Sequence, residues 1–112
     1  MKTGLRNAGV LMDKFGLWAM LEAKPGKERE LEDFLKSAKP MAEAEPETTT
    51  WYALKIGKSR YGIFDTFTNE DGRKAHLNGE IAKALMKSAK DLLAHEPRIE
   101  HTEILAAKAP GA

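Results

Sequence analysis

The sequence predicts an α+β domain with the element order β-α-β-β-α-β, the ferredoxin-like arrangement. Three observations lead to this prediction. A stretch rich in Thr, Trp, Tyr and Ile, with a tight turn at 57–59, predicts a β-hairpin over 48–67. One segment with apolar residues at helical spacing precedes the hairpin, and another follows it. Short apolar runs at 15–23 and 98–108 supply the outer strands, so we expect two helices on one face of a four-stranded antiparallel sheet.

The first predicted strand, 15–23, is apolar on both faces. Leu17 and Leu21 alternate with Trp18 and Met20, and a Pro-Gly pair ends the run. The helix that follows begins near residue 27, with acidic residues early and basic residues later, as the helix dipole favours. Pro40 lies inside its pattern and should kink this helix or end its first part near Lys39.

The second helical region is expected to begin after the hairpin, with Asn69 as its N-cap. Asn78 and Gly79 predict a sharp bend, after which an amphipathic helix runs from Glu80 to the break before Pro97. The alternation in 98–108 then predicts the last strand.

A chain of 112 residues fits one domain. We expect a loosely ordered extension at 1–14, the domain at 15–108 and a tail at 109–112, with Met1 or Met12 as the natural start. The formal net charge of +1 indicates no general attraction to nucleic acid or to an anionic membrane. No apolar run reaches the roughly 18–20 residues of a membrane span. The chain has no cysteine, which excludes disulfides and thiolate chemistry and fits a cytoplasmic protein.

The hairpin and the first strand carry large apolar residues on both faces, and two helices cover only one of them. A bare apolar face of that size is unusual on a monomer. We therefore expect a symmetric homodimer in which two sheets cover each other.

Several motifs in this order resemble the antibiotic biosynthesis monooxygenase-like family of dimeric α+β barrels. They are Leu-Trp-Ala-Met-Leu-Glu-Ala followed by Lys-Pro-Gly-Lys-Glu, then Glu-Pro-Glu-Thr-Thr-Thr, Phe-Asp-Thr-Phe, Asn-Glu and Arg-Lys-Ala-His-Leu, spread over 15–108. The resemblance implies a homodimer with a pocket between the sheet and the helices of each subunit. Some family members oxidise polycyclic phenols to quinones with molecular oxygen, without metal or flavin. Others degrade haem, isomerise small lactones or have no assigned reaction, so the fold is implied more firmly than the chemistry.

His76 is the strongest catalytic candidate, because a neutral imidazole accepts a phenolic proton or binds a substrate oxygen. The alternative is a histidine paired with a backbone carbonyl at the bend or with Glu80. Arg60 and Asp65 are charged residues on an apolar strand, which either orient a substrate or pair with each other. The candidate walls for an aromatic ligand, with core or dimer interface as their alternative role, are Trp18, Trp51, Tyr52 and Phe64.

Other chemistries have weaker support. The haem-degrading branch uses an asparagine on its first strand and a tryptophan after its third, and this chain has neither. The three histidines lack metal-ligand spacing, and His101 is expected to face the core or barrel interior. An RNA-recognition reading fails because Ile63 stands where a stacking aromatic belongs. We thus expect a monooxygenase-like enzyme that needs no cofactor, with a non-catalytic ligand-binding or stress-response barrel and a lactone isomerase as alternatives.

Overall fold

The structure is a computed structural model that describes residues 13–109. Most of the predicted extension at 1–14, including Met12, and most of the tail at 109–112 lie outside the described residues. The elements within 13–109 are β1 (Phe15–Glu22), α2 (Glu28–Ser37), α3 (Lys39–Glu43), β2 (Thr48–Lys55), β3 (Arg60–Phe67), α4 (Glu70–Leu77), α5 (Glu80–Leu92) and β4 (Arg98–Glu103).

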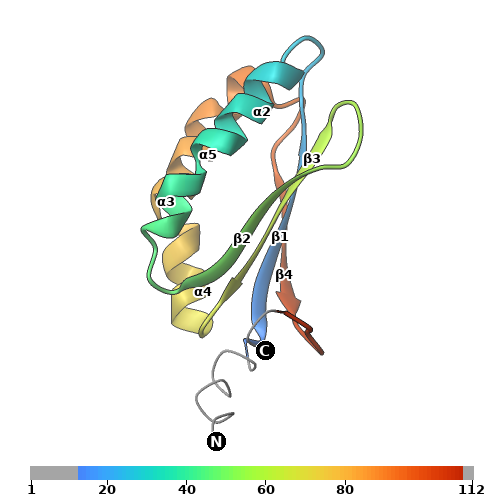
Figure 1. The fold of residues 1–112 in the computed structure, drawn as a ribbon. Helices are drawn as coiled ribbons and strands as arrows, with labels where there is room; N and C mark the ends of the chain where they lie inside the picture. The colour runs from blue at the N-terminus through green and yellow to red at the C-terminus, as the bar shows by residue number, and fades with distance from the viewer. Residues whose placement is uncertain (1–12, 110–112) are drawn as a thin grey trace, which may run out of the picture.

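The strands form one antiparallel sheet in the order β2-β3-β1-β4. All the helices lie in one layer on one face of this sheet, and no described helix covers the other face (Figure 1). The predicted ferredoxin-like fold is therefore confirmed. The hairpin and both helical regions lie where the sequence places them.

Both helical regions are divided at the residues that predict a break. Pro40 lies at the start of α3, and the chain bends at Ala38 between α2 and α3. Asn69 caps α4, because its Oδ1 accepts a 2.8 Å hydrogen bond from the backbone N–H of Gly72. The bend at Asn78 and Gly79 separates α4 from α5. Because α4 ends at this bend, His76 in its last turn lies against β3 of the sheet.

The last strand is shorter than predicted, because β4 ends at Glu103 rather than near residue 108. Glu103 pairs with Phe15, the first residue of β1, so the neighbouring strand offers no further partner for regular pairing. Beyond this point the Ile104 N–H donates to the Lys14 carbonyl, and Leu105 is exposed. Alternation without a partner strand does not make a sheet.

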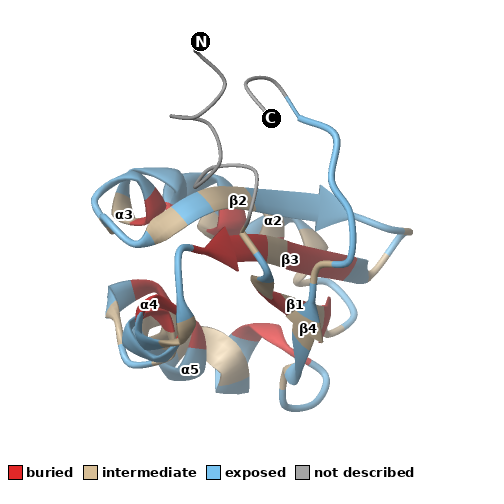
Figure 2. Cartoon of the chain, turned by 90° about the horizontal axis from the view of Figure 1, so that it is seen from below, coloured by how far each residue is buried: buried red, intermediate tan, exposed pale blue. Residues whose placement is uncertain are grey.

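The central strands β1 and β3 are more buried than the outer strands β2 and β4 (Figure 2). Leu17, Ala19 and Leu21 of β1 pair with Asp65, Ile63 and Tyr61 of β3, and all six are buried on the helix-covered face. The residues that alternate with them lie on the open face: Trp18, Met20, Tyr52, Leu54 and Phe64.

Candidate functional site

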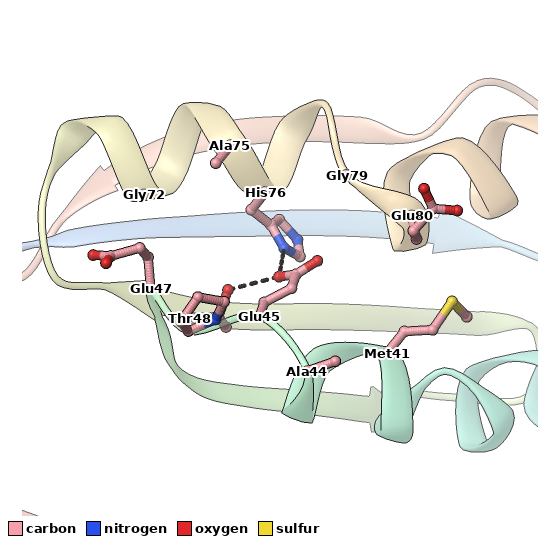
Figure 3. A pocket seen from close by; sticks show the side chains of 11 residues that line it. Met41, Ala44, Glu45, Glu47, Thr48, Gly72, Ala75, His76, Gly79 and Glu80 are labelled. Atoms are coloured by element: carbon pink, nitrogen blue, oxygen red, sulfur yellow. Dashed lines mark hydrogen bonds and ion pairs between the residues drawn. The ribbon is translucent and has the colours of Figure 1, made fainter.

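His76 lies in the last turn of α4 and points at the segment before β2 (Figure 3). Only 8% of the residue is exposed. Its Nδ1 lies 2.6 Å from Glu45 Oε1, and its Nε2 lies 2.9 Å from Asp65 Oδ2. The ring also packs on Phe67 at 5.2 Å between centroids. Both ring nitrogens of this buried imidazole therefore face a carboxylate.

Asp65 lies on the helix-covered face of β3 and is 1% exposed. No described protein group makes a hydrogen bond of good geometry to either of its oxygens, although the distance to His76 Nε2 is short. We therefore regard the contact between Asp65 and His76 as an ion pair rather than an aligned hydrogen bond. A carboxylate buried in this way is costly unless a positive charge accompanies it.

Glu45 completes a row of three ionisable groups, Glu45–His76–Asp65, which we call the acidic-histidine array. Glu45 Oε1 also accepts a 2.7 Å hydrogen bond from Thr48 Oγ1. Glu45 belongs to the connection between α3 and β2, so the array joins that connection to α4 and β3.

The array changes the acid-base properties of its members. Burial works against a charged His76, but the close negative charge of Asp65, followed by the hydrogen bonding and charge of Glu45, outweighs it and raises the pKa of His76 to about 8. Burial raises the pKa of Asp65 above its usual value, and the positive charge of His76 limits the rise. His76 is therefore mostly protonated at neutral pH.

A pocket of about 360 Å³ opens beside the array, between the connection before β2 and the helices α4 and α5. It has a size suited to a small organic ligand. Three of its lining residues are acidic, and none is Lys or Arg; the lining consists of Met41, Ala44, Glu45, Pro46, Glu47, Thr48, Gly72, Ala75, His76, Gly79 and Glu80.

A second cavity, which we call the inner chamber, lies on the sheet side of His76. It has a volume of about 40 Å³. Its walls are apolar except for Asp65 and His76: Leu17, Ala19, Ile63, Leu77, Ile81, Ala82, Leu85 and Ile99. His76 lines both this chamber and the larger pocket.

The sequence-derived candidates separate into two groups in the structure. His76 and Asp65 are brought together, whereas Arg60 is exposed at the far end of β3 and lines a different pocket with His95 and Arg98. Arg60 and Asp65 do not pair. The partner of His76 is neither Glu80 nor a backbone carbonyl. His101 is exposed rather than part of the core of this chain.

The four aromatic candidates do not line the pocket beside His76. Trp18, Tyr52 and Phe64 lie on the open face of the sheet. Trp51 lies on the helix-covered face, beside a separate pocket that includes Thr48 to Thr50. As substrate walls, these residues remain a prediction, which involves the open face for Trp18, Tyr52 and Phe64 only.

Two residues of the site were missed by sequence reasoning. The sequence around Glu45 indicates only a helix break. The fold brings this residue to His76, which lies 31 positions later in the chain. Arg73 is buried on α4, and its Nη1 donates to the carbonyls of Gly16 and Thr102, at 3.2 and 3.1 Å, which fixes α4 against β1 and β4. One signal for Arg73 exists, because it lies three residues before His76 and so on the same side of the helix.

Comparison with solved structures places the fold among known proteins. NE2512 from Nitrosomonas europaea, a protein of unknown function, is 57% identical, with a TM-score of 0.86 over 88% of this chain and 96% of that chain. A candidate antibiotic biosynthesis monooxygenase from N. europaea is 12% identical, with a TM-score of 0.74 over 83% and 91% of the two chains. Another candidate from Chloroflexus aurantiacus is 15% identical, with a TM-score of 0.67 over 86% and 97%.

The last two structures confirm, at the level of the fold, the resemblance that the motifs predict. No protein-family model and no curated protein matches the chain. Within residues 13–109, no helix is long and apolar enough to cross a membrane. No cluster of three or more His, Asp or Glu in the same residues is arranged to hold a metal ion.

Proposed function

The chain belongs to one family with NE2512 and has the antibiotic biosynthesis monooxygenase-like fold, and on this basis we propose that it is an oxygenase of a small phenolic molecule. The reaction would use molecular oxygen without a bound metal or flavin, as the resemblance implies. The observation that carries the proposal is the acidic-histidine array, in which the buried pair of His76 and Asp65 meets the half-buried Glu45 at the wall of a ligand-sized pocket. Perturbed ionisable groups beside a pocket are typical of catalytic sites.

The proposed step begins with proton removal. Glu45 lines the pocket and accepts the hydroxyl proton of the substrate, because His76 is mostly charged at neutral pH and is a poor base there. The imidazolium of His76 lines the same pocket and stabilises the phenolate that forms. Asp65 holds His76 in its charged form from the other side. Arg60 lines a separate pocket and has no part in this step.

The overall reaction balances for an anthrone-type phenol. The electron-rich phenolate supplies electrons to dioxygen, one oxygen atom becomes the new carbonyl of the quinone, and the other leaves as water. The two hydrogens lost from the ring carbon account for that water. The protein contributes proton transfer, positioning and exclusion of bulk water.

The charge of the pocket favours a neutral substrate. Glu45, Glu47 and Glu80 line it, and its only positive charge, that of His76, is already paired with Glu45 and Asp65. An anion such as a preformed phenolate or a carboxylate would be repelled by these groups. A neutral phenol brings its proton into the pocket, which the proposed first step requires.

Oxygen uptake with a hydroxyanthrone tests the proposal directly. We expect consumption of one dioxygen for each quinone formed, with no added metal or flavin. Glu45→Gln should lower the rate at least tenfold, since general-base catalysis contributes about 10²–10⁴-fold. Glu43→Gln is the matched control, because Glu43 pairs with Lys39 on the exposed side of α3 and does not line the pocket.

Absence of oxygen uptake with a panel of neutral phenols would reject the oxygenase. Saturable binding of those phenols without turnover would then favour the non-catalytic ligand-binding barrel. Double-bond migration within an unsaturated lactone, without oxygen uptake, would favour the isomerase. Equal rates for Glu45→Gln and Glu43→Gln would reject the role given to Glu45.

We further propose that the protein acts as a homodimer joined through the open face of the sheet. Tyr52 is 54% exposed and Leu54 is 41% exposed on that face, next to the half-buried Trp18 and Phe64. No described helix covers these side chains. A second copy of the sheet would bury them and would place Trp18, Tyr52 and Phe64 between the two subunits.

A further inference from the structure

We infer that the inner chamber is a water site, in which water donates hydrogen bonds to Asp65 and links this carboxylate to solvent beside Ile99. The chamber is distinct from the ligand pocket, and the inference does not depend on the oxygenase reaction. It follows from three properties of the chamber: its polar group, its size and its position at an edge strand.

The polar group is Asp65, which is 1% exposed and lines the chamber. Its Oδ1 has no hydrogen-bonding partner among the described protein groups. An ionised carboxylate has about four acceptor positions, and the contact with His76 Nε2 uses one oxygen at most. Buried acceptors of this kind are nearly always satisfied, by protein or by water.

The size of the chamber permits water. Its volume of about 40 Å³ exceeds the roughly 10–15 Å³ that one buried water needs on this measure. The remaining walls are aliphatic, with Ala19, Ile63 and Leu85 among them, and offer no competing hydrogen bond. Water in the chamber would therefore bind at Asp65 and His76, the only ionisable groups in its lining.

The chamber reaches the edge strand of the sheet at Ile99. Ile99 of β4 lines the chamber and is exposed, so water has a short route in from solvent past this edge strand. A wholly apolar cavity of similar size would stay dry and accept a gas such as dioxygen or xenon. The carboxylate of Asp65 makes water the better occupant.

Water at Asp65 has a consequence for the whole array. Hydration favours the ionised form of Asp65, and this negative charge favours the protonated form of His76. Glu45 also favours the protonated form of His76, from the pocket side. The other charged residues that line the two cavities are Glu47 and Glu80, both in the larger pocket. Removing water from the chamber should thus lower the pKa of His76.

A high-resolution crystal structure of the unmodified protein tests the site itself. We expect electron density for water within about 2.6–3.2 Å of Asp65 Oδ1. Xenon-pressurised crystals provide the opposite probe, because xenon occupies dry apolar cavities. An empty chamber, or xenon bound against Asp65, would overturn the inference.

A cavity-filling variant tests the consequence in solution. Ala82→Leu places a larger side chain into the chamber from α5, and Ala84→Leu makes the same change at a half-buried position that lines neither cavity. NMR titration of the His76 ring should give a lower pKa for Ala82→Leu than for the unmodified protein and for Ala84→Leu. An unchanged pKa in a folded Ala82→Leu protein whose crystal structure shows the chamber filled would contradict the inference. Neither measurement requires turnover, so both remain informative if the oxygenase proposal fails.

Discussion

His76 and Asp65 form an ion pair, Nε2 to Oδ2 at 2.9 Å, in which both residues are more than nine-tenths buried. Such a pair contributes little net stability when it is intact, because desolvation offsets the attraction. The pair instead favours two charged forms: the imidazolium of His76 beside the pocket and the carboxylate of Asp65 beside the inner chamber. The pair therefore makes both the stability and the proposed chemistry depend on the charge of one side chain.

Stability should fall as the pH rises from about 6.5 to 8. The pKa of His76 is raised from 6.5 to about 8 in the folded protein, so the folded state holds its proton more tightly than the unfolded state. The resulting contribution of about 2 kcal/mol is fully present below pH 6.5 and is lost as the pH passes through about 8. Urea denaturation at a series of pH values measures it, and His76→Gln should flatten the profile across this window.

Removing the imidazole should destabilise the fold strongly. His76→Ala leaves Asp65 buried without its positive partner, and breaking a buried pair costs about 3–5 kcal/mol. His95→Ala is the matched control, because the His95 ring is exposed and its contact with Glu22 is long, at 3.6 Å. This substitution should change the free energy of unfolding by at most about 0.5 kcal/mol. Equal midpoints of denaturation for the two variants would show that the buried pair does not matter for folding.

Gly72 should tolerate no side chain. A Cβ at this position would lie 2.7 Å from the Cβ of Glu47, which forces α4 away from the connection that carries Glu45. We expect Gly72→Ala to cost about 1–3 kcal/mol, as overpacking generally does. Gly57→Ala in the hairpin turn has nothing within 4 Å of the added Cβ and should change the free energy of unfolding by at most about 0.5 kcal/mol. A Gly72→Ala protein as stable as Gly57→Ala would mean that the connection moves aside freely.

Much of the fold is predictable from local patterns in this sequence. Strand alternation, the N-cap at Asn69 and the break at Pro40 each act over a few residues, and each is found where it was expected. The end of β4 was not predictable in the same way. It depends on where β1 begins, because Phe15 is the residue opposite Glu103.

The site was only partly predictable for a related reason. His76 and Asp65 stand out as polar residues in apolar surroundings, but their pairing depends on how α4 lies across the sheet. Glu45 gives no local signal, since an acidic residue in a helix break is ordinary. Its partner comes from a helix that begins 25 residues later in the chain.

The open face of the sheet should control the oligomeric state. Leu54→Glu places a charge on the exposed apolar face of β2, where a partner sheet would bury it at a high cost. We expect the unmodified protein to have twice the 12.4 kDa mass of the chain and the variant to have the mass of one chain, by light scattering after size exclusion.

Met86→Glu is the control, because Met86 is also apolar and exposed but lies on α5, in the helix layer. It should remain a dimer. A monomeric unmodified protein at micromolar concentration would rule out the paired-sheet arrangement, and dissociation by Met86→Glu alone would move the interface to the helices.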